Sequence, residues 1–145
     1  MRTLQKGFSL VTAIFLLVVL GGLGTMMVTF FTAQQQSSAL DVMGSRAYQA
    51  SRAGIDWAAY NVTQTVPGTP WAGCATYAAA TPLFAAGTMT GTLSPFAVAL
   101  TCASASAVEG ASTIYTYDLT STATYGGAPG NADYVERVIT VKMGR

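Results

Sequence analysis

The chain has 145 residues, and its seven Lys or Arg and six Asp or Glu leave a formal net charge of +1. Charged residues make up 9% of the chain and are scattered, which excludes the clustered Lys and Arg that phosphate binding requires. With no histidine and two cysteines, the chain lacks the groups for a Ser/His or Cys/His nucleophile pair or a four-ligand zinc site, so we expect no enzyme activity, cofactor or metal, with calcium at Asp118, Asn131 and Asp133 as the alternative. We also expect no small-molecule substrate, and the scattered basic residues predict no nucleic acid as partner.

The first predicted element is an apolar helix that covers residues 8–33. No charged residue occurs between Lys6 and Asp41. As a helix, about 24 of these residues rise about 36 Å, which exceeds the hydrocarbon thickness of about 30 Å. Arg2 and Lys6 precede the run, so the positive-inside rule places residues 1–7 in the cytoplasm and the rest of the chain across the membrane.

A cleavable secretory signal is the alternative for the same segment. The apolar core of such a signal spans about 7–15 residues and ends at a small-x-small site. Here the run is longer, and a cut after Ala33 would place Phe31 at the third position before it. We therefore expect the segment to be retained in the mature protein.

Three glycines lie within this run, at Gly21, Gly22 and Gly24. Each costs about 1 kcal/mol relative to alanine inside a helix, so together they mark a weak point. One interpretation is a face for close packing against another helix. The other is a segment that unwinds once the helix leaves lipid, where broken backbone hydrogen bonds are no longer penalised.

The helix is predicted to continue through residues 34–63, because the next proline is Pro67. Apolar or small residues recur at three- and four-residue steps, which indicates an amphipathic helix. This predicted face consists of Leu40, Met43, Ala47, Ala50, Gly54, Ala58 and Val62. Arg46 and Arg52 lie mainly elsewhere and belong either to a solvated face or to a contact with a neighbouring subunit.

Residues 64–145 are predicted to form a small globular β-rich domain. The stretch 66–97 is rich in turn formers and is predicted to be irregular. Runs of β-branched and aromatic residues then predict antiparallel strands at 96–102, 112–121 and 133–143. The expected fold class is α+β, with a long N-terminal helix packed on a small antiparallel sheet.

Cys74 and Cys102 are the two cysteines of the chain. Beyond the membrane they would meet an oxidising compartment, so we expect a disulfide. Closing this loop is worth about 3–4 kcal/mol in the chain-entropy description and would order a charge-poor segment. Two free buried thiols are the alternative.

The N-terminal residues, with Gly7 before Phe8 and the run FSLVTAIFLLVVLGGLG, resemble the leader and stem of a type IV pilin precursor. The resemblance implies that a membrane prepilin peptidase cuts between Gly7 and Phe8 and that Phe8 is N-methylated. Residues 1–7 would be the discarded leader, and the stem would serve as a membrane anchor and later as the filament core. In that family the glycine-rich part of the stem loses helicity in assembled filaments.

Thr12 departs from the family pattern. The fifth residue of a mature pilin is usually a glutamate, whose carboxylate meets the positive N-terminus of a neighbouring subunit. The attraction between two opposite charges is strong in an apolar bundle because the dielectric constant is low, and a threonine offers no neutralising charge. The family members that lack this glutamate are minor, tip-type subunits, so the resemblance favours a minor role.

A second segment, SRAYQASRAGIDWAAYNV at residues 45–62, resembles minor pilins of the MshP type, from mannose-sensitive haemagglutinin (MSHA) pilus systems. PilX-like and GspK-like minor pilins share a looser version, and DYVERVITVKM near the C-terminus is also similar to MshP-type chains. The resemblance implies a pilin-like fold, other pilins and the pilus assembly platform as partners, and a role in pilus biogenesis and adhesion. It places the protein in the bacterial inner membrane, with a periplasmic C-terminal domain, and then in the pilus.

Two other functions remain as alternatives. A tip pseudopilin of a type II secretion system would share the stem, but such proteins usually carry a larger insert in the globular domain. An ordinary single-pass anchor with a periplasmic domain would share the apolar helix and would never polymerise.

Overall fold

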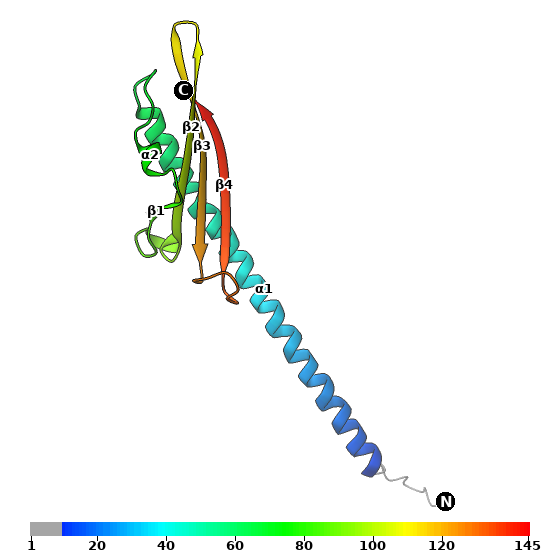
Figure 1. Ribbon diagram of the computed structural model, residues 1–145. Helices are drawn as coiled ribbons and strands as arrows, with labels where there is room; N and C mark the ends of the chain where they lie inside the picture. The colour runs from blue at the N-terminus through cyan, green and yellow to red at the C-terminus, as the bar shows by residue number, and fades with distance from the viewer. Residues whose placement is uncertain (1–9) are drawn as a thin grey trace, which may run out of the picture. The chain divides into compact units, whose positions relative to one another are not determined.

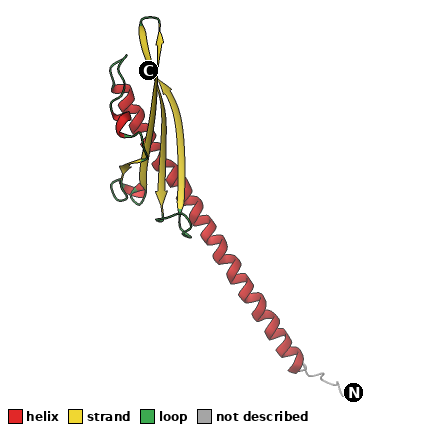
Figure 2. Cartoon of the chain, viewed as in Figure 1, coloured by secondary structure: helices red, strands yellow, loops and turns green. Residues whose placement is uncertain are grey.

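The computed structural model of the protein describes residues 10–145, so Gly7 and Phe8 lie outside the described residues. The chain divides into two compact units, the first ending at Ala39 and the second comprising Leu40–Arg145. Residues 10–39 are called the stem below, and Leu40–Arg145 the C-terminal domain. In chain order the elements are α1 (Leu10–Gln64), α2 (Gly73–Thr76), β1 (Thr81–Phe84), the 3₁₀ turn η1 (Gly91–Leu93), β2 (Ala97–Glu109), β3 (Ser112–Tyr125) and β4 (Val135–Gly144) (Figures 1 and 2).

The stem is the first part of α1 and is helical throughout, including Gly21, Gly22 and Gly24. Threonine hydroxyls here donate to the carbonyls of the preceding turn. The Thr25 hydroxyl lies 2.8 Å from the Gly22 carbonyl oxygen, and Thr29 bonds Met26 in the same way at 2.7 Å. Both hydroxyls are therefore hydrogen-bonded within the helix, although they lie on an apolar surface. The prediction of one long N-terminal helix is confirmed.

The C-terminal domain contains a four-stranded antiparallel sheet in the order β1-β2-β3-β4. Neighbours in the sheet are consecutive in the chain, and a two-residue turn joins β2 to β3, whereas longer loops join β1 to β2 and β3 to β4. The β2–β3 turn places Gly110 at its first central position with a φ of 62°, a conformation that suits glycine in a two-residue hairpin. The predicted α+β class, with one long helix and a small antiparallel sheet, is confirmed.

The strands are longer than the sequence indicated. The predicted strand 96–102 extends to Glu109 in β2, and the predicted strand 112–121 extends to Tyr125 in β3. Between Ala103 and Ala107 alanine and serine alternate, and alanine in particular is depleted in strands. Pairing with β3 along the whole of β2 overrides that weak local preference.

The stretch 66–97, predicted to be irregular, also contains regular structure. β1 pairs with β2 at the sheet edge, and α2 and η1 lie on either side of β1 in the chain. Pro82 is compatible with β1 because an edge strand leaves one row of N–H groups without partners. The density of turn formers in this stretch concealed these short elements.

The domain core lies between the small-residue face of α1 and one face of the sheet. From the predicted face, Ala47, Ala50, Gly54, Ala58 and Val62 are buried, Met43 is half-buried and Leu40 is exposed. The sheet contributes the buried residues Val98, Leu100, Cys102, Tyr117, Leu119 and Ala123. Within the domain, the small-residue face of α1 is therefore the face that packs on the sheet.

Candidate functional site

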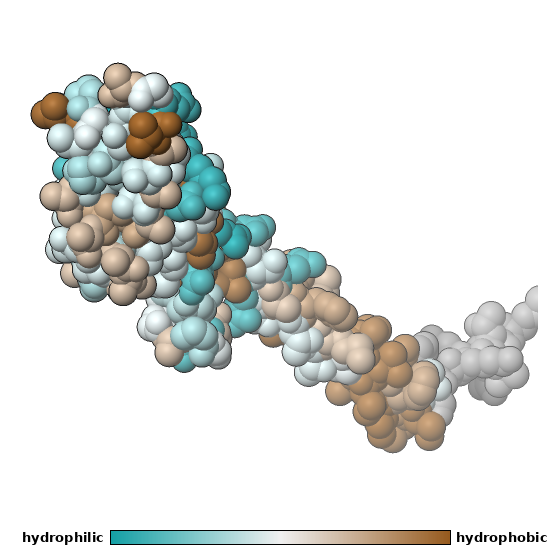
Figure 3. All heavy atoms as spheres, turned by 45° about the horizontal axis from the view of Figure 1, so that its top comes forward, coloured by the Kyte–Doolittle hydropathy of each residue, from teal (hydrophilic) through white to brown (hydrophobic). Residues whose placement is uncertain are grey.

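The stem has an apolar exterior that is exposed from Leu10 to Phe31. Leu10 is 74% exposed and Phe30 is 68% exposed, and the side chains between them are exposed as well. Figure 3 shows this concentration of hydrophobic residues along the stem. Soluble monomers rarely expose contiguous apolar patches larger than a few hundred Å². Lipid or other apolar helices are the surroundings that fit such a surface.

By length and composition, α1 is a candidate membrane-spanning helix, and no other helix in residues 10–145 passes that test. A secretory signal close to the N-terminus would pass it too. The stem has no charged residue from Leu10 to Ala39. A membrane anchor and a signal are therefore both compatible with this helix.

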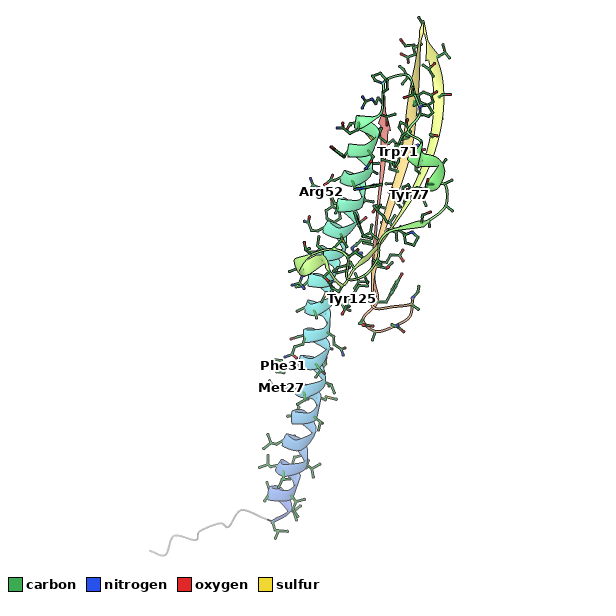
Figure 4. All side chains as sticks on the ribbon, turned by 90° about the vertical axis from the view of Figure 1, so that its left-hand side faces the viewer. Met27, Phe31, Arg52, Trp71, Tyr77 and Tyr125 are labelled. Carbon is green, nitrogen blue, oxygen red and sulfur yellow. A yellow bond between two sulfur atoms is a disulfide. The ribbon has the colours of Figure 1, made fainter. Side chains whose placement is uncertain are left out.

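Thr12 lies in the helical part of the stem, with an exposed side chain. Met27 and Phe31, one helical turn apart, also project from the stem, as Figure 4 shows. The stem presents apolar side chains, hydroxyls and, at residues 34–36, glutamine amides, and it carries no carboxylate. Any contact it makes inside an apolar bundle must depend on packing and hydrogen bonds.

The segment that resembles minor pilins, residues 45–62, positions α1 on the sheet. A Cβ added at Gly54 would overlap the Ser121 hydroxyl and lie 2.9 Å from Val98 Cγ1, so the helix backbone is as close to the sheet as a glycine allows. The buried Ser51 hydroxyl donates to the Ser121 carbonyl oxygen at 2.7 Å. The small residues of this motif therefore serve helix–sheet packing in this chain.

Arg52 belongs to the solvated face of α1. Its Nε lies 3.8 Å from an Asp56 carboxylate oxygen, and both side chains are mostly exposed, so the pair contributes little stability. In Figure 4 Arg52 projects from the helix on the side away from the sheet. Arg46 is half-buried. Arg52 is available for a contact outside the subunit, but no described contact assigns it one.

Cys74 in α2 and Cys102 in β2 form a disulfide, with their Cα atoms 5.2 Å apart. The bond attaches the α1–β1 connection to the centre of the sheet. Beside it, the Cys102 backbone N–H donates to the Tyr77 carbonyl oxygen at 2.6 Å. Covalent and main-chain links together hold a segment whose composition provides few apolar anchors.

An aromatic cluster of Trp57, Trp71 and Tyr77 covers the same region. Trp71 stacks on Tyr77 with ring centroids 6.0 Å apart, and Trp57 meets both rings edge-on. Figure 4 shows Trp71 and Tyr77 on the same side of the domain. The Trp71 backbone N–H donates to the Tyr117 hydroxyl at 2.8 Å. Sequence reasoning missed this cluster, since only tertiary structure brings Trp57 to Trp71.

The end of α1 is capped by Arg145. Its guanidinium donates to the carbonyl oxygens of Val62, at 3.1 Å, and Thr63. A cation at a helix C-terminus is favourable because the last carbonyls carry partial negative charge. The Arg145 backbone also exchanges two hydrogen bonds with Tyr115 of β3. No local pattern predicts this cap, because it joins residues 82 or more positions apart.

Titratable side chains of the C-terminal domain gather in two separate places. Asp41, Tyr134, Glu136 and Arg137 line a hollow of about 240 Å³, and Asp118 and Lys142 line another hollow on the sheet. Lys142 pairs with Asp118 at 3.2 Å on the exposed sheet face, and the Tyr134 hydroxyl donates to Glu136 on β4. That hydrogen bond, then burial, then the negative charge of Glu136 raise the pKa of Tyr134 above its ordinary value. Within residues 10–145, no group of three His, Cys, Asp or Glu side chains gathers as a metal site.

Two further hollows of the domain carry few titratable side chains. One of about 470 Å³ is lined by Pro67, Ser112, Arg145 and their neighbours. Another of about 310 Å³, lined by Phe84 and small residues of β2 and β3, is almost wholly apolar. In the first, the one titratable side chain is Arg145, which already caps α1.

No known protein family, curated protein or solved structure matches this chain. The fold and the stem define a class in coarse terms. It is a protein with one candidate membrane-spanning helix at its N-terminal end and a C-terminal domain in which the same helix packs on a four-stranded antiparallel sheet.

Proposed function

We propose that the protein is a non-enzymatic minor pilin-like subunit of an MSHA-type type IV pilus. The observation that carries the proposal is the uninterrupted helix α1, with an exposed, uncharged apolar stem and a later part packed on a sheet. The leader-like residues Gly7 and Phe8 and the motif at 45–62 support the same function by resemblance. The subunit contributes to pilus assembly and adhesion from a position at or near the tip.

The mechanism is storage of the stem in the inner membrane followed by extraction. Prepilin peptidase removes residues 1–7 and exposes Phe8, and the stem then exchanges lipid contacts for contacts with other pilin stems. Lipid tails are about as apolar as leucine side chains, so this exchange has little hydrophobic driving force. An assembly ATPase, a different protein of the assembly machinery, supplies the work.

The tip position is supported by Thr12. A shaft subunit must satisfy the positive N-terminus of a neighbour inside an apolar bundle, where an unpaired charge is costly. Thr12 has no charge, and no carboxylate occurs in the stem between Leu10 and Ala39. A subunit at the tip has no neighbour above it and does not need the carboxylate.

The first experiment measures the mass of the mature protein isolated from cells with working pili. We expect loss of residues 1–7 and one added methyl group on Phe8. Gly7→Ala should leave the uncleaved precursor in the membrane, whereas Ser9→Ala, two residues away, should mature normally. An intact N-terminus, or normal maturation of Gly7→Ala, would support the non-polymerising anchor and contradict the proposal.

A second experiment tests the position in the filament. An epitope tag on the C-terminal domain is located by immunogold on sheared filaments, and label confined to filament ends is expected. Regular label along the shaft would contradict the tip position while leaving the pilin function intact. Loss of protein secretion with normal pili, on deletion of the gene, would instead support the secretion-system pseudopilin.

A further inference from the structure

The β2–β3 hairpin continues past the rest of the sheet as an arm, defined here as Ala103–Tyr115. Within residues 10–145 it has only two strands beyond Tyr115, whose hydrogen bonds with Arg145 end the pairing on the β4 side. In Figure 1 this yellow hairpin extends beyond the ends of β1 and β4. The ladder continues to the pair Glu109 and Ser112, whereas β1 pairs with β2 over Val98–Leu100 only. The described residues of the arm are exposed or half-buried, and Val108 is 76% exposed. Two isolated strands are marginally stable in water, so the arm would gain from further pairing.

The outer edge of β2 in the arm carries main-chain groups that point away from β3. Tyr115 exchanges both of its backbone hydrogen bonds with Arg145 on the other side of β3. Its partner Ser106 is therefore half of a non-hydrogen-bonded pair with Tyr115, and the Ser106 N–H and C=O point to the outer edge. By alternation, Ser104 and Val108 point their main-chain groups the same way.

The outward-facing main-chain groups of β2 have partners as far as Cys102, whose N–H donates to the Tyr77 carbonyl oxygen. Beyond Cys102 the chain offers no further partner among its described residues, so Ala103–Glu109 forms a free edge. Natural proteins usually protect such edges with lysine, proline or a bulge. Here Ala and Ser alternate from Ala103 to Ala107, and the first charge is Glu109 at the turn.

This free edge is complementary to itself. If two copies pair antiparallel with Ser106 opposite Ser106, then Ser104 faces Val108, and Ala103 faces Glu109 of the other copy. No like charges are opposed in this register, which would matter across a strand pair. The Gly110 turn of one copy falls opposite Cys102 of the other, the residue whose N–H is already bonded to Tyr77. The available edge and the available strand therefore match in length.

We infer that the arm is a homotypic docking strand, through which a second copy of this chain adds edge to edge along Ala103–Glu109. The contact makes about six main-chain hydrogen bonds and converts two marginal ribbons into one four-stranded sheet. It is smaller than a standard stable interface, so a single pair of arms associates weakly, and arms presented in several copies associate by avidity. This inference does not depend on the pilus function.

The test uses the full chain in detergent micelles and compares two proline variants. Ser106→Pro removes an outward N–H at the centre of the proposed contact and leaves the β2–β3 ladder intact. Thr113→Pro is the matched control. Thr113 and Val108 form a non-hydrogen-bonded pair, as Tyr115 and Ser106 do, so the Thr113 N–H points to the opposite edge of the arm. Association by the apolar stem would be the same in all three proteins.

Sedimentation velocity is measured over about a hundredfold range of concentration, since self-association depends on concentration. Ser106→Pro is expected to raise the dimer dissociation constant by at least about tenfold, while Thr113→Pro leaves it within about twofold of the unsubstituted chain. Amide hydrogen exchange at Ser104, Ser106 and Val108 should slow as concentration rises, and exchange at Thr113 should not.

The inference is overturned by a concentration-independent monomer or by association that Ser106→Pro leaves unchanged. Equal weakening by both prolines would also overturn it, because that result assigns association to the fold of the arm rather than to one edge. Binding of a different protein to the arm, with no self-association of this chain, would overturn it as well. Near-ultraviolet circular dichroism of the Trp57 and Trp71 cluster checks that both variants keep the domain core.

Discussion

Gly54 of α1 lies so close to Ser121 of β3 that the helix backbone and the strand leave no room for a Cβ atom. An alanine at this position would overlap the Ser121 hydroxyl and crowd Val98 at 2.9 Å. Overpacking of this kind costs about 1–3 kcal/mol, and the better helix propensity of alanine returns about 1 kcal/mol. We expect Gly54→Ala to lower the free energy of unfolding by about 1–2 kcal/mol, measured by chemical denaturation.

Gly44 provides the control for that prediction. It is also a buried glycine of α1, but an added Cβ would meet the end of the Arg137 side chain at 3.1 Å, which can move. Gly44→Ala should therefore be neutral or stabilise by up to about 1 kcal/mol. Equal destabilisation by both substitutions would contradict the assignment of close packing to Gly54.

Removing the Ser121 hydroxyl should stabilise the domain. Within residues 10–145 this buried oxygen has no hydrogen-bond partner, whereas the Ser121 carbonyl accepts from Ser51. A buried polar group without a partner costs about 1–3 kcal/mol. Ser121→Ala is expected to raise the free energy of unfolding by about 1 kcal/mol and to reduce the cost of Gly54→Ala in the double variant. Destabilisation by Ser121→Ala alone would show that the hydroxyl has a partner after all.

Loss of the disulfide should destabilise the C-terminal domain strongly. The sequence separation of 28 residues between Cys74 and Cys102 corresponds to about 3–4 kcal/mol of loop-closure entropy in the unfolded chain. We expect the Cys74→Ser/Cys102→Ser variant to lose that amount of unfolding free energy. Chemical reduction of the unsubstituted protein should produce the same loss, and reduction of the variant should have no effect.

The hydrogen bond from the Trp71 backbone N–H to the Tyr117 hydroxyl gives a more local prediction. Tyr117→Phe retains the ring in the core and removes the acceptor, leaving a part-buried N–H without its partner. The expected loss is about 1–2 kcal/mol. Amide exchange at Trp71 should accelerate more than exchange in the β2–β3 ladder; uniform acceleration would indicate a general loss of packing.

Much of the fold follows from patterns that are local in the sequence. The uncharged run before Asp41 predicts the stem, and the three- and four-residue spacing from Ala47 to Val62 predicts the buried face of α1. The β-branched runs locate β3 and β4 to within a few residues. In each case the local preference agrees with the environment that the fold provides.

The remainder depends on contacts between distant segments. Residues 103–109 form a strand because β3 pairs with them, and nothing in the alternation of alanine and serine requires it. The cap of α1 by Arg145 and the meeting of Trp57 with Trp71 likewise join segments that only the tertiary fold brings together. The spacing at Gly54 predicts a buried position, but not that glycine is required there.

Tyr134 should titrate at unusually high pH. The hydrogen bond to Glu136, burial and the Glu136 charge all favour the protonated phenol and raise its pKa above 10.0. The folded state therefore holds this proton more tightly than the unfolded state, and the associated stability is complete below the ordinary pKa and lost as pH rises through the raised one. Glu136→Gln should lower the Tyr134 pKa, measured by NMR of the ring; an unchanged value would contradict the assigned cause.

The stem glycines separate the stability of the subunit from its assembly. A Cβ at Gly21, Gly22 or Gly24 would meet nothing within 4 Å, so alanines there are tolerated in the free subunit. Each should favour the helix by about 1 kcal/mol, visible as higher helicity in micelles.

If the pilus function is correct and this segment unwinds in the filament, the triple alanine variant should mature normally at Gly7 yet enter pili at least about tenfold less, because about 3 kcal/mol of added helix stability opposes unwinding. Unchanged incorporation, by immunoblot of sheared pili, would favour a straight stem. Matched alanines at Val18, Val19 and Leu20 remove apolar contact area without removing glycine, so a loss of equal size in that control would assign the effect to packing instead.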